Sequence, residues 1–215
     1  MRAAYYTWEE VEARAARLHR QLEALLGEPP DMPIDVDLIG EQLLGLSWLY
    51  EPIPEPPGTT ILAALHPEQR LVVLNERHVE TFGRNEGLER FTKAHEMGHW
   101  VLHATVDGRR QTVDGSSGSD SGRRRSSNSS ELPTVDCPPT CGGYPPSPEA
   151  ERGWQERQAN WFAAALLMPP MPLKRAAADV DVTGWRGRYE LSGRCGVSIS
   201  ALNSRLRQLG YPSVR

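Results

Sequence analysis

Apolar residues recur at helical spacing near the start of the chain, over residues 8–26. The positions that fall on one face are Val11, Ala15, Leu18, Leu22 and Leu25. This spacing predicts an amphipathic helix whose apolar face packs on a core. Gly27 and the proline-rich segment after it end the helix. A second, shorter helix is predicted over residues 34–46, with Asp35 as its candidate cap.

Three short segments then favour β-strands. They cover residues 47–53, 59–65 and 70–76, and a stretch rich in proline and glycine separates the first two. Two longer segments follow with helical periodicity, over residues 87–103 and 149–168. This order of elements predicts an α+β fold in which helices pack on a small sheet.

Residues 105–148 separate the two long helices and have a different composition. Serine, glycine and arginine dominate much of this segment, which predicts a low-complexity insertion. Past the second long helix, residues 173–215 predict a small C-terminal helical element, with two short helices around a turn at Gly196. We therefore expect a main domain over residues 1–172, interrupted by the insertion, with the C-terminal element packed on it.

The composition narrows the class of protein. The net charge is −4 and the isoelectric point about 5.9, which argues against a protein that coats nucleic acid. No stretch is long and apolar enough to span a membrane, and the first residues lack the apolar run of a secretory signal. Three cysteines, Cys137, Cys141 and Cys195, are few and odd in number. Together these features predict a cytoplasmic protein.

The strongest chemical motif is a pair of histidines four residues apart. His95 and His99 lie on one face of the predicted helix, and Glu96 follows the first of them. This His-Glu-x-x-His pattern is typical of zinc peptidases, in which the glutamate takes a proton from a zinc-activated water. The stripe that contains the histidines is Leu88, Phe91, His95, His99 and Leu102, so we expect both rings to point inward.

A catalytic zinc usually takes three protein ligands, so one more is needed. Thr105 stands where a third histidine would follow in one known pattern, and His103 lies a full turn beyond His99. Glu156 is the better candidate, because its helix predicts an inward stripe of Glu156, Ala159, Ala163 and Leu166. Asn160 shares that face and could hydrogen-bond a ligand histidine. Alternatively, Glu156 is a carboxylate favoured only by the helix dipole.

Two segments together resemble the ImmA/IrrE family of metallopeptidases. They are "RFTKAHEMGHWVLH" at residues 90–103 and "ERQANWFAAALLMP" at residues 156–169. The segments "LVVLNERH" and "LSGRCGVSISALNSRLRQLG" are similar to the family as well. The resemblance implies a zincin-like domain in which His95, His99 and Glu156 bind zinc and Glu96 is the catalytic base. It also implies a substrate class, helix-turn-helix repressors, whose cleavage derepresses stress-response or mobile-element genes.

Several details stay open at the level of the sequence. Manganese would suit the same ligands as zinc. A further donor to the developing oxyanion is expected, and His103, Tyr144 and Arg152 are the candidates. The three cysteines could hold a second metal or form a redox pair, but unremarkable thiols are the simpler interpretation.

Two other classes of function compete with a peptidase. Residues 184–215 carry six arginines and a single acidic residue, Glu190, which would suit a DNA-binding regulator. Packing of this element on the main domain is the plainer interpretation of the same segment. The third class is a module that uses a peptidase scaffold to bind a partner without cutting it.

Overall fold

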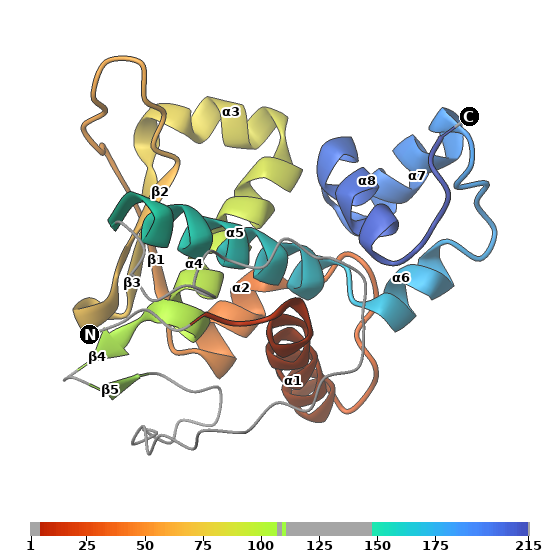
Figure 1. Ribbon diagram of the computed structural model, residues 1–215, viewed down its shortest axis with the longest axis horizontal. Coiled ribbons are helices and arrows are strands. Elements are labelled where there is room, and N and C mark those ends of the chain that lie inside the picture. Colours follow the sequence, from red (N-terminus) through yellow and green to blue (C-terminus); the bar gives the residue numbers. More distant parts are fainter. Residues whose placement is uncertain (1–4, 107–108, 111–147, 215) are drawn as a thin grey trace, which may run out of the picture.

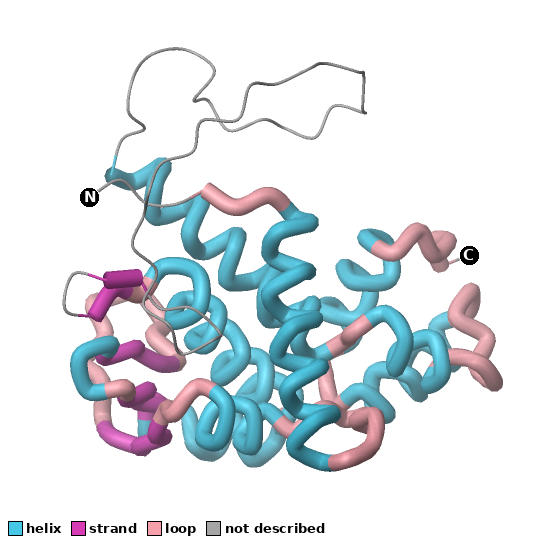
Figure 2. Tube along the Cα trace, turned by 90° about the horizontal axis from the view of Figure 1, so that it is seen from below, coloured by secondary structure: helices cyan, strands magenta, loops and turns pink. Residues whose placement is uncertain are grey.

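The computed structural model describes residues 5–106, 109–110 and 148–214. Figure 1 shows a small sheet at one end of the molecule and the C-terminal helices at the other, with two long helices between them. Figure 2, seen from below, shows the same division, with the strands gathered on one side. The described chain is therefore an α+β fold, as the sequence predicts.

Helix α1 (Trp8–Leu26) begins and ends as its sequence predicts. Thr7 caps its start: the Thr7 side chain accepts from the Glu10 amide, and the Glu10 carboxylate accepts from the Thr7 amide. Gly27 ends it with φ of 77°, a left-handed conformation that costs glycine little. Four of the five predicted core positions are buried. The exception is Leu25, near the end of the helix, which is 52% exposed.

The second predicted helix is a short and irregular one. Asp35 caps α2 (Val36–Leu38) by accepting from the Leu38 amide at 2.9 Å, and the chain continues as a π-helical turn over Ile39–Leu43. Gly40 lies in this turn against the Trp48 ring, where a Cβ atom would overlap the ring carbons. The absence of a side chain at Gly40 therefore allows the turn to pack closely against Trp48 of the first strand, β1 (Ser47–Glu51).

The sheet contains three strands in the order β1–β3–β2. The central strand β3 (Leu71–Asn75) pairs in parallel with β1 (Ser47–Glu51) and antiparallel with β2 (Ala63–His66). Each predicted strand is therefore present but shorter than predicted. Val72, Val73 and Leu74 of β3 are buried, so the central strand supplies the apolar face of the sheet.

After a short 3-10 turn at Glu76–His78, helix α3 (Val79–Arg84) leads into the first long helix, α4 (Glu86–His103). The short strands β4 (Thr105–Val106) and β5 (Arg109–Arg110) pair antiparallel at the start of the predicted insertion. Residues 111–147 lie outside the described residues. The second long helix, α5 (Pro148–Leu167), crosses α4 and also packs on α1.

Three further helices complete the chain: α6 (Pro170–Ala176), α7 (Trp185–Cys195) and α8 (Ile199–Gln208). The sequence predicts the last two and the turn between them, where Gly196 has φ of 60° and Ser198 caps α8. Leu191 of α7 and Val197 in the turn are buried. Helix α6 was not predicted, and the proposed boundary at residue 172 falls within it.

The C-terminal helices share one hydrophobic core with the rest of the described chain. Arg205 of α8 is fully buried; it donates to the Met168 carbonyl at 2.9 Å and pairs with Glu12 of α1. A buried guanidinium needs such partners, because an unpaired charge in the interior is costly. This contact ties the last helix to the first.

Candidate metal and catalytic site

Helix α4 carries the histidine motif, and polar side chains fix both its start and its middle. Asn85 caps the helix by accepting from the Leu88 amide at 3.2 Å. Lys93 forms ion pairs with Asp37 at 2.9 Å and with Glu89 at 2.8 Å, although its own side chain is nearly buried. These contacts hold α4 against α2, so the motif two residues further on is presented at a defined place.

Three side chains from α4 and α5 meet at one point. The Nε2 atom of His95 lies 3.1 Å from that of His99 and 3.1 Å from Oε2 of Glu156. The other oxygen of Glu156, Oε1, lies 3.3 Å from Nε2 of His99. Among the described residues, these three side chains form the group of possible metal ligands whose ligand atoms are close enough to bind one ion.

These separations fit a tetrahedral zinc site. Zinc binds imidazole nitrogen and carboxylate oxygen at about 2.0–2.1 Å, which sets neighbouring ligand atoms of a tetrahedron about 3.3 Å apart. The two Nε2 atoms are 3.1 Å apart, and each lies 3.1 or 3.3 Å from a different oxygen of Glu156, so the spacing of the three groups is close to this value. The donor set, two imidazoles and one carboxylate, is also the one that the sequence predicts.

Asn160 determines which nitrogen of His95 faces the site. Its Oδ1 atom lies 3.1 Å from Nδ1 of His95. Because an amide oxygen only accepts, Nδ1 carries a proton, and whenever the ring is neutral the lone pair of Nε2 faces Glu156 and His99. A lone pair that faces a carboxylate calls for a cation between them, either a proton or a metal ion.

The electrostatics of the site agree with this need for positive charge. Burial by itself would lower the pKa of His95, but the hydrogen bond to Glu156 and the charge of Glu96 outweigh it and raise the pKa. The hydrogen bonds from His95 and His99 lower the pKa of Glu156 well below its usual range. Burial raises the pKa of Glu96, which suits a group that must accept a proton and return it.

The predicted inward stripes require a correction. The side chains of His95 and His99 are 17% and 19% exposed, and that of Glu156 is 59% exposed. The fully buried residues of α4 are Ala94, Met97 and Leu102, and of these only Leu102 belongs to the predicted stripe. Helical spacing identifies a face, but these three residues lie where α4 and α5 emerge from the core. Glu156 is therefore an accessible carboxylate rather than a buried one in need of a partner.

A glycine that sequence reasoning missed allows the two helices to approach. A Cβ atom at Gly98 would lie 3.0 Å from the Cα atom of Ala159 and 3.1 Å from its carbonyl oxygen. A side chain at this position would require the facing backbone of α5, the helix that carries Glu156, to shift by a few tenths of an ångström. The available signal was a glycine inside a strongly helical segment, which often marks a close backbone approach.

The three candidate oxyanion donors are placed differently. His103 is the last residue of α4, and its ring centroid is 5.7 Å from that of His99. Arg152 is exposed on α5, one helical turn before Glu156. Tyr144 lies outside the described residues.

The cysteines do not form a described cluster. Cys195 is fully buried at the end of α7, and burial raises its pKa to about 12. Cys137 and Cys141 lie outside the described residues. A second metal site that includes Cys195 would need to reach into the hydrophobic core.

Three of the five C-terminal arginines that the structure describes have structural partners. Arg188 is buried and donates to the Val182 carbonyl at 2.7 Å and to Asn203. Arg194 pairs with Asp179 and Glu190, and Arg205 pairs with Glu12. These three guanidinium groups hold the C-terminal helices together rather than forming a surface for phosphate contacts.

Comparison with known proteins supports the family that the sequence resembles. Residues 147–207 match the model of a peptidase family described as the IrrE N-terminal-like domain. The match covers α5, with Glu156 and Asn160, and continues through α6 and α7 to nearly the end of α8. It supports the assignment of the chain to the ImmA/IrrE family. No curated protein sequence matches the chain significantly.

Among solved structures, the fold is similar to that of a Mycobacterium tuberculosis transcriptional regulator. The TM-score is 0.50 and the sequence identity 18%, over 95% of this chain. The aligned region spans 58% of the length of that protein. Within the described residues, no helix is both long and apolar enough to cross a membrane.

Proposed function

We propose that the protein is a zinc-dependent metallopeptidase with a zincin-like active site, which hydrolyses a peptide bond in a protein substrate. The observation that carries this proposal is the convergence of His95, His99 and Glu156 on one point, with Glu96 next to His95 on α4 and in electrostatic contact with all three. The match to a peptidase family over α5 is an independent support.

In this proposal, each residue of the site has a distinct role. His95, His99 and Glu156 hold the metal, and Asn160 keeps the ring of His95 in the tautomer that can bind it. A bound zinc ion supplies a Lewis acid that activates water and polarises the scissile carbonyl. Glu96 accepts the proton of the attacking water and returns it to the leaving amine. The raised pKa of Glu96 favours the first of these steps, because it makes the carboxylate a stronger base.

The substrate class follows from the family rather than from the geometry of the site. We propose a helix-turn-helix transcriptional repressor, whose cleavage would release stress-response or mobile-element genes. The name of the structural neighbour, a transcriptional regulator, is compatible with a role in gene control. A DNA-binding role for the C-terminal element has less support, since three of its six arginines are engaged within the fold.

The test is cleavage that depends on zinc. Wild-type protein would be stripped with a chelator, reloaded with zinc or manganese, and incubated with helix-turn-helix repressors from the same genome and with a peptide library. New N-termini would be mapped by mass spectrometry. The proposal expects cleavage that disappears with the chelator and returns with the metal. Tight binding of a repressor that is never cut would instead favour a binding module.

A further inference from the structure

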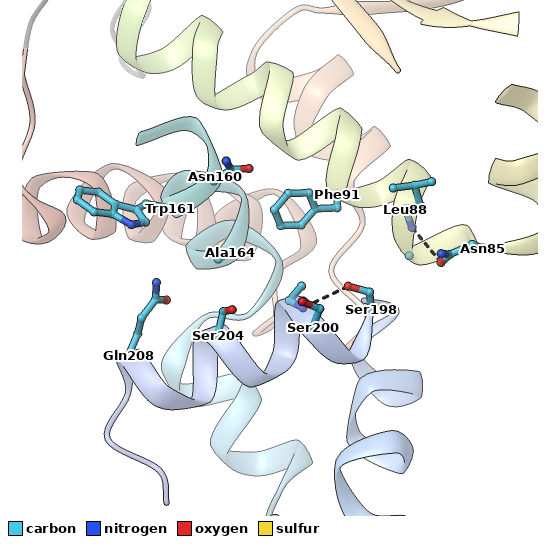
Figure 3. Close-up of a pocket in the computed structure, with 12 residues that line it drawn as sticks. Asn85, Leu88, Phe91, Asn160, Trp161, Ala164, Ser198, Ser200, Ser204 and Gln208 are labelled. Atoms are coloured by element: carbon cyan, nitrogen blue, oxygen red, sulfur yellow. Dashed lines mark hydrogen bonds between the residues drawn. The ribbon is translucent and has the colours of Figure 1, made fainter. Parts of the chain in front are cut away.

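A pocket lies between the C-terminal helix α8 and the two helices of the candidate site. Its volume is about 400 Å³, within the range of ligand pockets, and residues of α4, α5 and α8 line it (Figure 3). The proposed metal ligands and Glu96 do not line this pocket.

The pocket has one apolar wall and one polar wall. Leu88 and Phe91 of α4, with Trp161 and Ala164 of α5, form the apolar wall. Facing them, Ser200, Ser204 and Gln208 follow each other at intervals of four residues on α8 (Figure 3). This spacing forms a continuous stripe about 12 Å long, enough for three to four residues of an extended peptide.

Asn160 joins this pocket to the candidate site. It is one of the lining residues, and its Oδ1 atom lies 3.1 Å from Nδ1 of His95. Phe91 stands one helical turn before His95 on the same face of α4. A peptide whose scissile bond lies at the metal ligands would therefore meet the pocket within a short distance along its chain.

We infer that the pocket receives an uncharged, mainly apolar side chain of the protein substrate near the scissile bond, while the α8 stripe binds the adjacent peptide backbone. This inference rests on the proposed peptidase function. Of the described residues that line the pocket, none is charged. A charged side chain would lose its hydration there without an ionic partner, so the pocket selects against it.

The experiment alters the α8 wall and reads peptide preference in two ways. Peptides are selected from a random library for binding to zinc-loaded Glu96→Gln, and the same peptides are offered to zinc-loaded wild type for cleavage. Ser204→Trp fills the pocket from an exposed position that lines it. Arg207→Trp is the matched control, since position 207 is exposed on the same helix but does not line the pocket. Ser204→Asp instead adds a negative charge.

The selected peptides should share a leucine-, methionine- or phenylalanine-like residue at one fixed position. Ser204→Trp should weaken their binding at least about tenfold, a change of 1.4 kcal/mol, whereas Arg207→Trp should leave it unchanged. Ser204→Asp should shift the preference at that position towards lysine or arginine, an exchange of specificity that loss of folding cannot produce.

The possible outcomes distinguish failure of the proposed role of the pocket from failure of the proposed peptidase activity. If peptide binding depends on position 204 but wild type cleaves none of the peptides, the proposed peptidase activity is refuted and the proposed role of the pocket is supported. If Ser204→Trp, Ser204→Asp and wild type cleave peptides with the same residue preference, the proposed role of the pocket is refuted and the proposed peptidase activity is supported. If no peptide binds zinc-loaded Glu96→Gln above background, the pocket assignment is wrong.

Discussion

Gly98 of α4 packs directly on the backbone of Ala159 in α5, where a Cβ atom would lie 3.0 Å from the Ala159 Cα atom. This contact sets the distance between the helix that carries both histidines and the helix that carries Glu156. The geometry of the candidate site therefore depends on a residue that binds nothing itself.

Gly98→Ala should separate the two helices. We expect a loss of about 1–3 kcal/mol in the free energy of unfolding, as for other overpacked cores, together with weaker zinc binding. Gly153→Ala on α5 is the control, because nothing lies within 4 Å of its added methyl group. That change should be neutral or stabilise the helix by up to about 1 kcal/mol. Denaturant titration of both variants, with zinc affinity measured alongside, tests the contact; equal effects would contradict it.

The metal ligands should be separable from the residue that orients them. We expect about one zinc ion per chain, which is lost in His99→Ala, and zinc binding that is strongly weakened in Glu156→Gln. Asn160→Ala should weaken zinc binding by about 10–100-fold, as is typical for residues that orient a ligand. Glu149→Gln, an exposed carboxylate at the start of the same helix, should bind zinc normally. Elemental analysis and competition with a chelator dye measure all four, and full zinc content in His99→Ala would refute the ligand assignment.

Arg205 should contribute far more to stability than its neighbour Arg207. Arg205→Ala removes a fully buried guanidinium and leaves Glu12 and the Met168 carbonyl without their donor. Breaking a buried pair in this way costs about 3–5 kcal/mol. Arg207 is exposed on the same helix, and Arg207→Ala should change the free energy of unfolding by less than about 0.5 kcal/mol. Similar melting temperatures for the two variants would show that the C-terminal helices are not anchored as described.

Cys195 should react with thiol reagents only when the protein unfolds. Burial raises its pKa to about 12, so little of the thiol is ionised at pH 8, and the thiolate is the reactive form. In a variant with Cys137→Ser and Cys141→Ser, labelling should be slow in buffer and fast in denaturant. Rapid labelling of the native variant would mean that α7 does not pack in the core.

Much of the fold could be predicted from the periodicity of the sequence, because its helices are long and clearly capped. Helix α1 extends over the predicted residues, and α4 and α5 begin within one residue of the predicted positions. Strand positions were predicted less closely, since short apolar segments do not show where pairing stops. Helix α6 was missed because prolines that end one helix also favour the start of the next.

The candidate site was predictable in its residues but not in its surroundings. Spacing identified His95, Glu96 and His99, and the structure brings Glu156 and Asn160 to them. The exposure of Glu156 was predicted wrongly, because periodicity cannot show where a helix leaves the core. Gly98 and the pocket beside α8 depend on how helices cross, which is a property of the tertiary structure.

The most direct test of the central claim is the cleavage rate of Glu96→Gln at a zinc content equal to that of wild type. Glu96 is next to a proposed ligand but is not one of them, so the variant should retain its fold and its zinc. The amide cannot accept the proton of the attacking water, so we expect the cleavage rate of a repressor or library peptide to fall at least about 100-fold. Cleavage by zinc-loaded Glu96→Gln at the wild-type rate would contradict the proposed mechanism.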